Sequence, residues 1–157
     1  MKRRMILVFS LFFIFLYACF SDSVSSTERI KWISYNEGMT AGGKEGKKIF
    51  LSFYADWCTF CAKMDKETFK DPAIVKYLNE HFINIKIDTE KENEIARKHF
   101  VRGLPMTWFL ESNGDKISSL PGYIPPDMFL QILKYIETDS YKKMTFKEYS
   151  DSLEKKK

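Results

Sequence analysis

Apolar and polar residues follow one another along the chain in patterns that predict strands and helices. Residues 49–55 form an apolar, aromatic-rich run bounded by charged residues, which predicts a buried strand. Residues 82–87 alternate apolar and polar side chains and predict a second strand. Residues 106–110 and 116–120 are two further runs, and the polar turn sequence between them predicts a β-hairpin.

Segments with an apolar side chain every three or four residues predict amphipathic helices. Asp71 followed by Pro72 is a helix start signal, because the carboxylate caps the first turn and proline lacks an N–H that would be unpaired there. Residues 35–45 contain three glycines, which predicts only a short, weak helix. The other expected helices are residues 58–69, 72–81, 88–100, a segment that follows Pro125, and a short terminal helix with a capping box from Thr145 to Glu148.

From residue 49 onward the expected elements follow the order β-α-α-β-α-β-β-α. A strand-helix alternation followed by an antiparallel hairpin indicates the α/β class with a mixed central sheet. We expect residues 30–137 to form one domain and residues 138–157 to form a charged, partly helical C-terminal extension. We expect its terminal lysines to form a solvated tail. Weak attraction of these lysines to anionic lipid is the alternative.

Length, charge and composition narrow the class of protein. A chain of 157 residues is long enough for one domain with short additions, and its aromatic content of 16% argues against disorder. The net charge of +4 comes from basic residues spread along the chain, so nucleic-acid binding gains little support. The three cysteines are too few for a disulfide scaffold.

The N-terminus has the composition of a targeting segment. Three basic residues precede an apolar run over residues 5–18, which is shorter than the roughly 20 residues of a membrane-spanning helix. The sequence Leu16-Tyr17-Ala18-Cys19 resembles the lipobox of bacterial lipoproteins, and this resemblance implies cleavage after residue 18 and lipidation of Cys19. Residues 1–18 would then be the signal peptide and residues 19–29 a tether. An ordinary cleaved signal and an uncleaved anchor are the alternatives.

Redox chemistry is indicated by Trp57-Cys58-Thr59-Phe60-Cys61, which follows a buried strand and opens a helix. Cysteines three residues apart on a first helical turn lie on one face and can close a small disulfide ring. The helix N-terminus favours the thiolate of Cys58, so Cys58 is the expected nucleophile. Cys61, one turn later and more buried, is expected to resolve the mixed disulfide.

Other uses of this cysteine pair have less support. Structural zinc normally takes four ligands, and neither His81 nor His99 has a suitable spacing from Cys61. A purely structural disulfide would close a loop too short to stabilise the fold by much. We expect both histidines to be surface residues near the ends of their helices, and we expect no metal.

These motifs together resemble the thioredoxin superfamily over residues 49–137, through IFLSFYADWC, the strand ending at Asp88, and Val-Arg-Gly-Leu-Pro at residues 101–105. The flanking sequences GKKIFLSF and CAKMDKETFKDP are similar to exported thioredoxin-related proteins. The resemblance implies a three-layer α/β/α fold. It also implies that Pro105 is cis and faces the redox pair, that Leu104 offers its backbone to substrate, and that Trp57 contacts substrate.

The chain departs from the family at the acidic residue beneath the disulfide. Ser52 stands at that position, and Asn84 is the expected counterpart of the lysine that accompanies it. A hydroxyl is not a base near neutral pH, so water or Asp56 is the candidate proton relay for Cys61. The alternative is that Asp56 is an ordinary exposed carboxylate. The direction of electron flow stays open, because related proteins span roughly −270 to −120 mV.

The sequence thus predicts a thiol-disulfide oxidoreductase on the periplasmic side of a bacterial envelope, anchored by lipid, which reduces disulfides of exported proteins. A membrane thiol-electron transporter is the expected electron donor, because the periplasm is kept oxidising. No cofactor beyond the redox-active disulfide is expected, and the protein is expected to be a monomer. A disulfide oxidant or isomerase is one alternative, and a non-catalytic protein-binding module is another.

Overall fold

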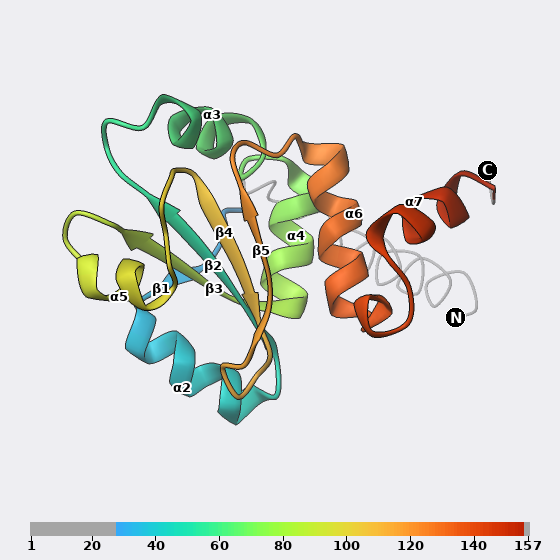
Figure 1. The fold of residues 1–157 in the computed structure, drawn as a ribbon, viewed down its shortest axis with the longest axis horizontal. Coiled ribbons are helices and arrows are strands. Elements are labelled where there is room, and N and C mark those ends of the chain that lie inside the picture. Colours follow the sequence, from blue (N-terminus) through green and yellow to red (C-terminus); the bar gives the residue numbers. More distant parts are fainter. Residues whose placement is uncertain (1–27, 156–157) are drawn as a thin grey trace, which may run out of the picture.

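The computed structural model describes residues 28–155 and contains one five-stranded sheet with the strand order β1-β3-β2-β4-β5 (Figure 1). The predicted signal peptide, Cys19, most of the tether and the last two lysines lie outside the described residues. The strands are β1 (Trp32–Ile33), β2 (Lys48–Tyr54), β3 (Phe82–Asp88), β4 (Met106–Leu110) and β5 (Lys116–Pro121). The helices are α2 (Tyr35–Glu45), α3 (Thr59–Glu67), α4 (Pro72–His81), α5 (Asn93–Lys98), α6 (Pro126–Glu137) and α7 (Phe146–Glu154), with a 3-10 turn η1 (Ser140–Lys142).

The sheet is mixed, as the order of elements predicts. Strands β1, β3 and β2 are parallel, whereas β4 runs antiparallel to both β2 and β5. Alternate residues of β2 face opposite sides: Phe50 packs in the core beneath α3, α4 and α6, while Leu51 packs in the core beneath α2 and α5. Figure 1 shows these helices on the two sides of the sheet. The thioredoxin-like three-layer α/β/α arrangement is therefore confirmed.

Helix α2 is a full eleven-residue helix, and its glycines explain how closely it approaches the sheet. A Cβ atom added to Gly38 would overlap the side chain of Ile85, and one added to Gly42 would lie 2.6 Å from Cδ1 of Ile49. These glycines lie four residues apart, on one face of the helix. The same residues that weaken the helix in isolation thus allow its backbone to pack against β3 and β2.

Two elements differ from the sequence-based expectations. Strand β1 was not predicted, because a two-residue strand has no periodicity to recognise. The helix expected over residues 88–100 is confined to α5. Its first part is a turn instead, in which the Asp88 carboxylate accepts a hydrogen bond from the Glu90 N–H at 3.0 Å and the Asp88 carbonyl accepts one from the Glu92 N–H at 2.8 Å.

The C-terminal extension packs against α6 and is held at its base by charged groups. Thr145 and Glu148 form the predicted capping box of α7, and Tyr149 packs against Tyr135 of α6. Asp139 lies 3.0 Å from Nζ of both Lys48 and Lys142. These hydrogen bonds, from Lys48 and then from Lys142, hold the pKa of Asp139 at about 2. No helix in the described part of the chain has the length and apolar character needed to cross a membrane.

His99 is buried, so the expectation that it lies on the surface is wrong. Only 3% of the residue is exposed, and its Nε2 lies 3.2 Å from the Tyr35 hydroxyl. The rings of Phe53 and Trp108 pack against its imidazole. Burial, together with Lys116 and Lys98, lowers the pKa of His99 from 6.5 to about 4, which keeps the imidazole neutral at physiological pH.

Candidate active site

The cysteine pair lies where β2 leads into α3, at the carboxyl end of a central strand. Cys58 is the N-cap residue of α3, and its Sγ accepts a hydrogen bond from the Cys61 N–H at 3.1 Å. The two cysteines form a disulfide, with their Cα atoms 5.2 Å apart. Both are buried, with 6% of Cys58 and 4% of Cys61 exposed, so the expected contrast in burial is small.

The start of α3 favours a thiolate once the disulfide is reduced. Unpaired N–H groups and the positive end of the helix dipole gather there, and a sulfur at the N-cap receives both. The first turn of α3 contains no acidic residue that would oppose this effect. The hydrogen bond from the Cys61 N–H to Sγ of Cys58 would strengthen if that sulfur became an anion.

Pro105 lies at the same end of the sheet as the cysteine pair. The Leu104–Pro105 peptide bond is cis, in agreement with the resemblance. Met106 pairs with Phe53 in the antiparallel register of β4 and β2, so Pro105 comes next to the end of β2, from which the chain continues to Cys58 (Figure 1). Pro105 is buried, and its carbonyl accepts a hydrogen bond from the Gly122 N–H at 2.8 Å.

Two aromatic side chains beside the cysteines are exposed to solvent. Trp57 is 69% exposed and Phe60 is 61% exposed, while Leu104 is half-buried. Nε1 of Trp57 donates a hydrogen bond to the Glu90 carboxylate at 3.0 Å, which ties the loop before α3 to the turn after β3. Sequence reasoning missed Glu90, because only the spatial neighbourhood of two loops reveals this contact. Two exposed aromatic side chains therefore flank Cys58 in the chain.

The expectation that Asn84 accompanies Ser52 is wrong. In the parallel pairing of β2 and β3, the residue opposite Ser52 is Lys86. Nζ of Lys86 lies 2.6 Å from Oδ1 of Asp65, which follows Cys61 by one turn of α3. Asn84 is instead buried two residues earlier, where its Nδ2 donates to the Leu78 carbonyl at 3.2 Å. A carboxylate paired with a lysine is thus present beside α3, but the carboxylate belongs to Asp65 of α3 and not to residue 52 of β2.

Carboxylates gather around the hydroxyl of Tyr54, at the end of β2. Burial and the negative charges of Asp88, Asp56 and Asp65 raise the pKa of Tyr54, so this hydroxyl stays protonated. Asp56 itself is exposed and has no hydrogen-bond partner among residues 28–155. Its role as a proton relay stays a prediction.

Within the described residues, no group of three or more His, Cys, Asp or Glu side chains is arranged to hold a metal ion. His99 is turned into an aromatic cluster, and His81 lies 3.7 Å from the Glu137 carboxylate, at the other end of α4 from Asp71. In the part of the chain that the structure describes, the hydrogen bonds, ion pairs and ring contacts of His81 and His99 are all with residues other than Cys58 and Cys61.

Comparison with known families and sequences points to the same chemistry. Residues 35–137 match the family model described as a thioredoxin-like domain. The thiol:disulfide interchange protein DsbD of Haemophilus ducreyi is 37% identical over 92 residues, which is 55% of this chain and 16% of that protein. DsbD of Actinobacillus pleuropneumoniae is 33% identical over 116 residues, which is 69% of this chain and 19% of that protein. The chain thus spans about a fifth or less of the length of these relatives.

Solved structures share the fold. A thioredoxin from Thermus thermophilus has a TM-score of 0.63 at 23% identity, covering 69% of this chain and 87% of its own. A thioredoxin-fold protein from Helicobacter pylori has a TM-score of 0.62 at 20% identity, covering 83% and 91%. The reduced C-terminal domain of Neisseria meningitidis DsbD has a TM-score of 0.54 at 25% identity, covering 63% and 90%. With Cys58 capping α3, a cis-Pro105 at the same sheet end, a Cys58–Cys61 disulfide and a family match over residues 35–137, this chain belongs to the thioredoxin-like domain family.

Proposed function

We propose that this protein is an envelope protein-disulfide reductase that uses Cys58 and Cys61 to reduce disulfides in exported proteins. The observation that carries the proposal is the position of Cys58 as N-cap of α3, with its Sγ accepting the Cys61 N–H. The exposed Trp57 and the backbone of Leu104 would receive an extended segment of the substrate. No cofactor is needed beyond the dithiol.

The reaction proceeds in two exchanges. The Cys58 thiolate attacks one sulfur of the substrate disulfide, forms a mixed disulfide and releases the other substrate sulfur as a thiolate. Cys61 then loses its proton, attacks Sγ of Cys58 and releases the second substrate sulfur. Two electrons have moved to the substrate, its two thiolates take up the proton lost by Cys61 and one proton from solvent, and the Cys58–Cys61 disulfide of the structure is the product.

The electron donor must regenerate the dithiol from this disulfide. We propose a membrane thiol-electron transporter as this donor. Support comes from the thiol:disulfide interchange proteins named DsbD, because this chain matches about a fifth or less of their length and has the fold of a DsbD C-terminal domain. We place the protein on the periplasmic side of a bacterial envelope, anchored through a lipid on Cys19 and acting as a monomer. Cys19 itself lies outside the described residues.

An oxidant or isomerase is the second candidate, because the same dithiol can run in either direction. Such enzymes often carry an inserted helical domain, whereas the chain between β3 and β4 holds only the six-residue α5. A non-catalytic binding module is the third candidate. It has no need of a cysteine at a helix N-cap beside a cis-proline.

Matched substitutions of the two cysteines test the chemistry. We expect Cys58→Ser to abolish reduction of insulin disulfides, because the attacking sulfur is gone. Cys61→Ser should instead accumulate mixed disulfides with substrate, detected as mass adducts that dithiothreitol removes. Activity in Cys58→Ser, or an absence of adducts in Cys61→Ser, would show that catalysis by this pair is wrong.

A redox titration against glutathione tests the direction of electron flow. A reductase should have a midpoint well below about −180 mV, and a midpoint above that value would favour the oxidant.

The intact mass of protein from the membrane fraction tests the anchor. Cleavage before Cys19 with added acyl mass is expected, and an unmodified Cys19 would exclude lipidation.

A further inference from the structure

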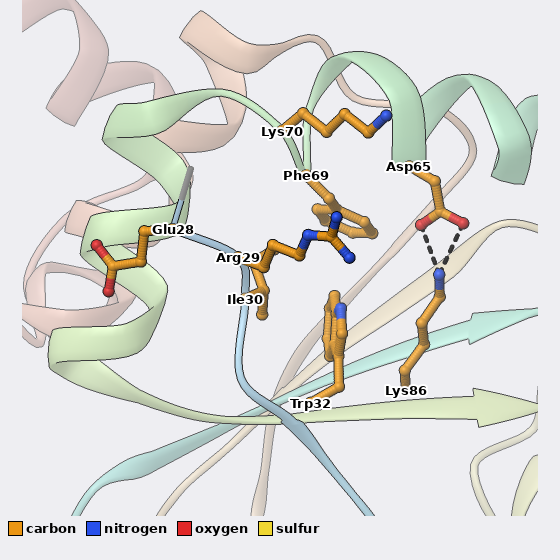
Figure 2. A pocket seen from close by; sticks show the side chains of 8 residues that line it. All are labelled: Glu28, Arg29, Ile30, Trp32, Asp65, Phe69, Lys70 and Lys86. Atoms are coloured by element: carbon orange, nitrogen blue, oxygen red, sulfur yellow. Dashed lines mark hydrogen bonds and ion pairs between the residues drawn. The ribbon is translucent and has the colours of Figure 1, made fainter. Parts of the chain in front are cut away.

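A recess lies on the face of the sheet that carries α3, and neither cysteine of the disulfide lines it. It has a volume of about 590 Å³ and is bounded by the segment before β1, the end of α3 and the middle of β3 (Figure 2). This volume falls within the range of pockets that hold small molecules, about 300 to 1,000 Å³. The redox chemistry proposed above makes no use of it.

The floor of this recess is aromatic. Trp32 stands on the edge strand β1 and Phe69 on the turn after α3, with their ring centroids 5.3 Å apart in an edge-to-face arrangement. Phe69 is buried, but Trp32 is only half-buried. Part of a large aromatic surface therefore faces the open side of the recess, where a flat apolar group would remove it from water.

The carboxylates around the recess already have partners. Both oxygens of Asp65 accept hydrogen bonds from Nζ of Lys86, at 2.6 and 2.7 Å. The Glu28 carboxylate accepts one from Nδ2 of Asn79 at 3.1 Å, and Figure 2 shows it turned toward α4, away from the other charges. Neither carboxylate is directed at the space above the aromatic floor.

Two cations, in contrast, have no acidic partner among residues 28–155. Figure 2 shows the Arg29 side chain extending into the recess over Trp32 and across Phe69 in this view, and Lys70 extending from the turn after α3 toward that helix. Neither side chain makes an ion pair or a hydrogen bond with another described residue, whereas Lys86 beside them is paired. Within the described residues, Arg29 and Lys70 therefore offer this recess positively charged donors that no carboxylate occupies.

We propose that this recess binds a small anion with an aromatic or other flat apolar body, either a carboxylate or a phosphate ester. The ring would lie on Trp32 and Phe69, and the anionic group would lie between Arg29 and Lys70. A planar guanidinium suits this role, because it can donate two parallel hydrogen bonds to a carboxylate or a phosphate.

Three ring-bearing probes test the proposal by calorimetry and by NMR titration of the full-length protein. We expect 3-phenylpropionate or phenyl phosphate to bind saturably and to shift the indole N–H signal of Trp32. The neutral 3-phenylpropionamide, which has the same ring without the charge, should bind about tenfold more weakly or worse. Binding of only one charged probe also supports the site and identifies the preferred anionic group.

Substitutions at the cations locate the site. Arg29→Gln and Lys70→Gln should each weaken binding of the charged probe by about tenfold. Lys31→Gln is the matched control, since Lys31 is an exposed cation two residues from Arg29 that does not line the recess. The proposal is overturned if neither charged probe saturates at millimolar concentration, if the amide binds equally well, or if Arg29→Gln and Lys31→Gln have the same affinity as the unaltered protein.

Discussion

The side chains of Lys86 and His99 lie on opposite faces of the same sheet. Lys86 has a carboxylate beside it, whereas His99 is packed among aromatic rings. Lys86 forms an ion pair with Asp65, with Nζ also 4.7 Å from the ring centroid of Tyr54, at the edge of an open recess. His99 lies among aromatic rings with a single hydroxyl as its hydrogen-bond partner, and burial lowers its pKa to about 4.

The two faces differ in whether water or a group of opposite charge can stabilise an ion. The face with α3 admits water and supplies a carboxylate, so a cation there costs little. The face with α2 is closed by a helix whose glycines let it lie directly on the strands, and it offers His99 no counter-ion. The redox pair lies at the start of α3, one of the helices that cover the same face as Lys86.

The largest effect is expected at His99 as the pH falls. Its pKa is about 4 in the folded protein and near 6.5 when unfolded, so the unfolded chain binds more protons in this window. His99 therefore stabilises the fold above pH 6.5, and up to about 3 kcal/mol of this contribution is lost as the pH falls toward 4. Urea unfolding of His99→Gln should show a correspondingly flatter dependence on pH.

His81→Gln is the control for this experiment, because His81 is partly exposed beside Glu137. Both variants are compared with the pH curve of the unaltered protein. If the curve of His99→Gln were parallel to it, the neutral, buried state of His99 would be contradicted.

A smaller effect is expected when the closed face is forced open. Gly42→Ala places a methyl group against Ile49, so α2 must shift and the unfolding free energy should fall by about 1 to 3 kcal/mol. Gly43→Ala is a close control on the same helix, where the added Cβ would meet only the Ser112 carbonyl at 3.8 Å. Its higher helix propensity should stabilise the protein by about 0.5 to 1 kcal/mol, and equal changes in the two variants would refute the close packing.

The smallest effect is expected on the open face. Lys86→Met removes the partner of Asp65 but leaves that carboxylate in contact with water, so the loss should be about 1 kcal/mol or less and should shrink with added salt. Urea unfolding at low and high sodium chloride measures both quantities. Lys66→Met, at an exposed residue of the same helix, should change stability by less than about 0.5 kcal/mol. A loss of several kcal/mol at Lys86 would mean that this face is closed as well.

Much of the fold could be predicted because its signals are local. The bounds of α2 and α4, the Asp71 N-cap of α4, the capping box of α7 and the hairpin all follow from neighbouring residues, and all are present. Helix α5 is shorter than predicted because the Asp88 side chain bonds to the next turn of backbone, which competes with a helix. Periodicity does not record that competition.

The candidate site divides in the same way. Cys58 and Cys61 could be identified from their spacing after an apolar strand, since a strand-to-helix junction places such a pair at a helix N-terminus. The contact of Trp57 with Glu90 could not, because it joins two loops through the parallel pairing of β2 and β3. The error at Asn84 has the same origin, since a register shift of two residues keeps the same face of the strand and changes only the neighbour.

The sequence by itself determined the cysteine pair, the order of strands and helices from residue 49 onward, and the family to which they belong, because each depends on residues close together in the chain. Only the tertiary structure decided that Lys86 and Asp65 meet beside the redox helix, that His99 is sealed and neutral, and that Arg29 and Lys70 share a recess over Trp32. Those outcomes depend on sheet register and on which faces the helices close, and both are fixed by packing between segments distant in sequence.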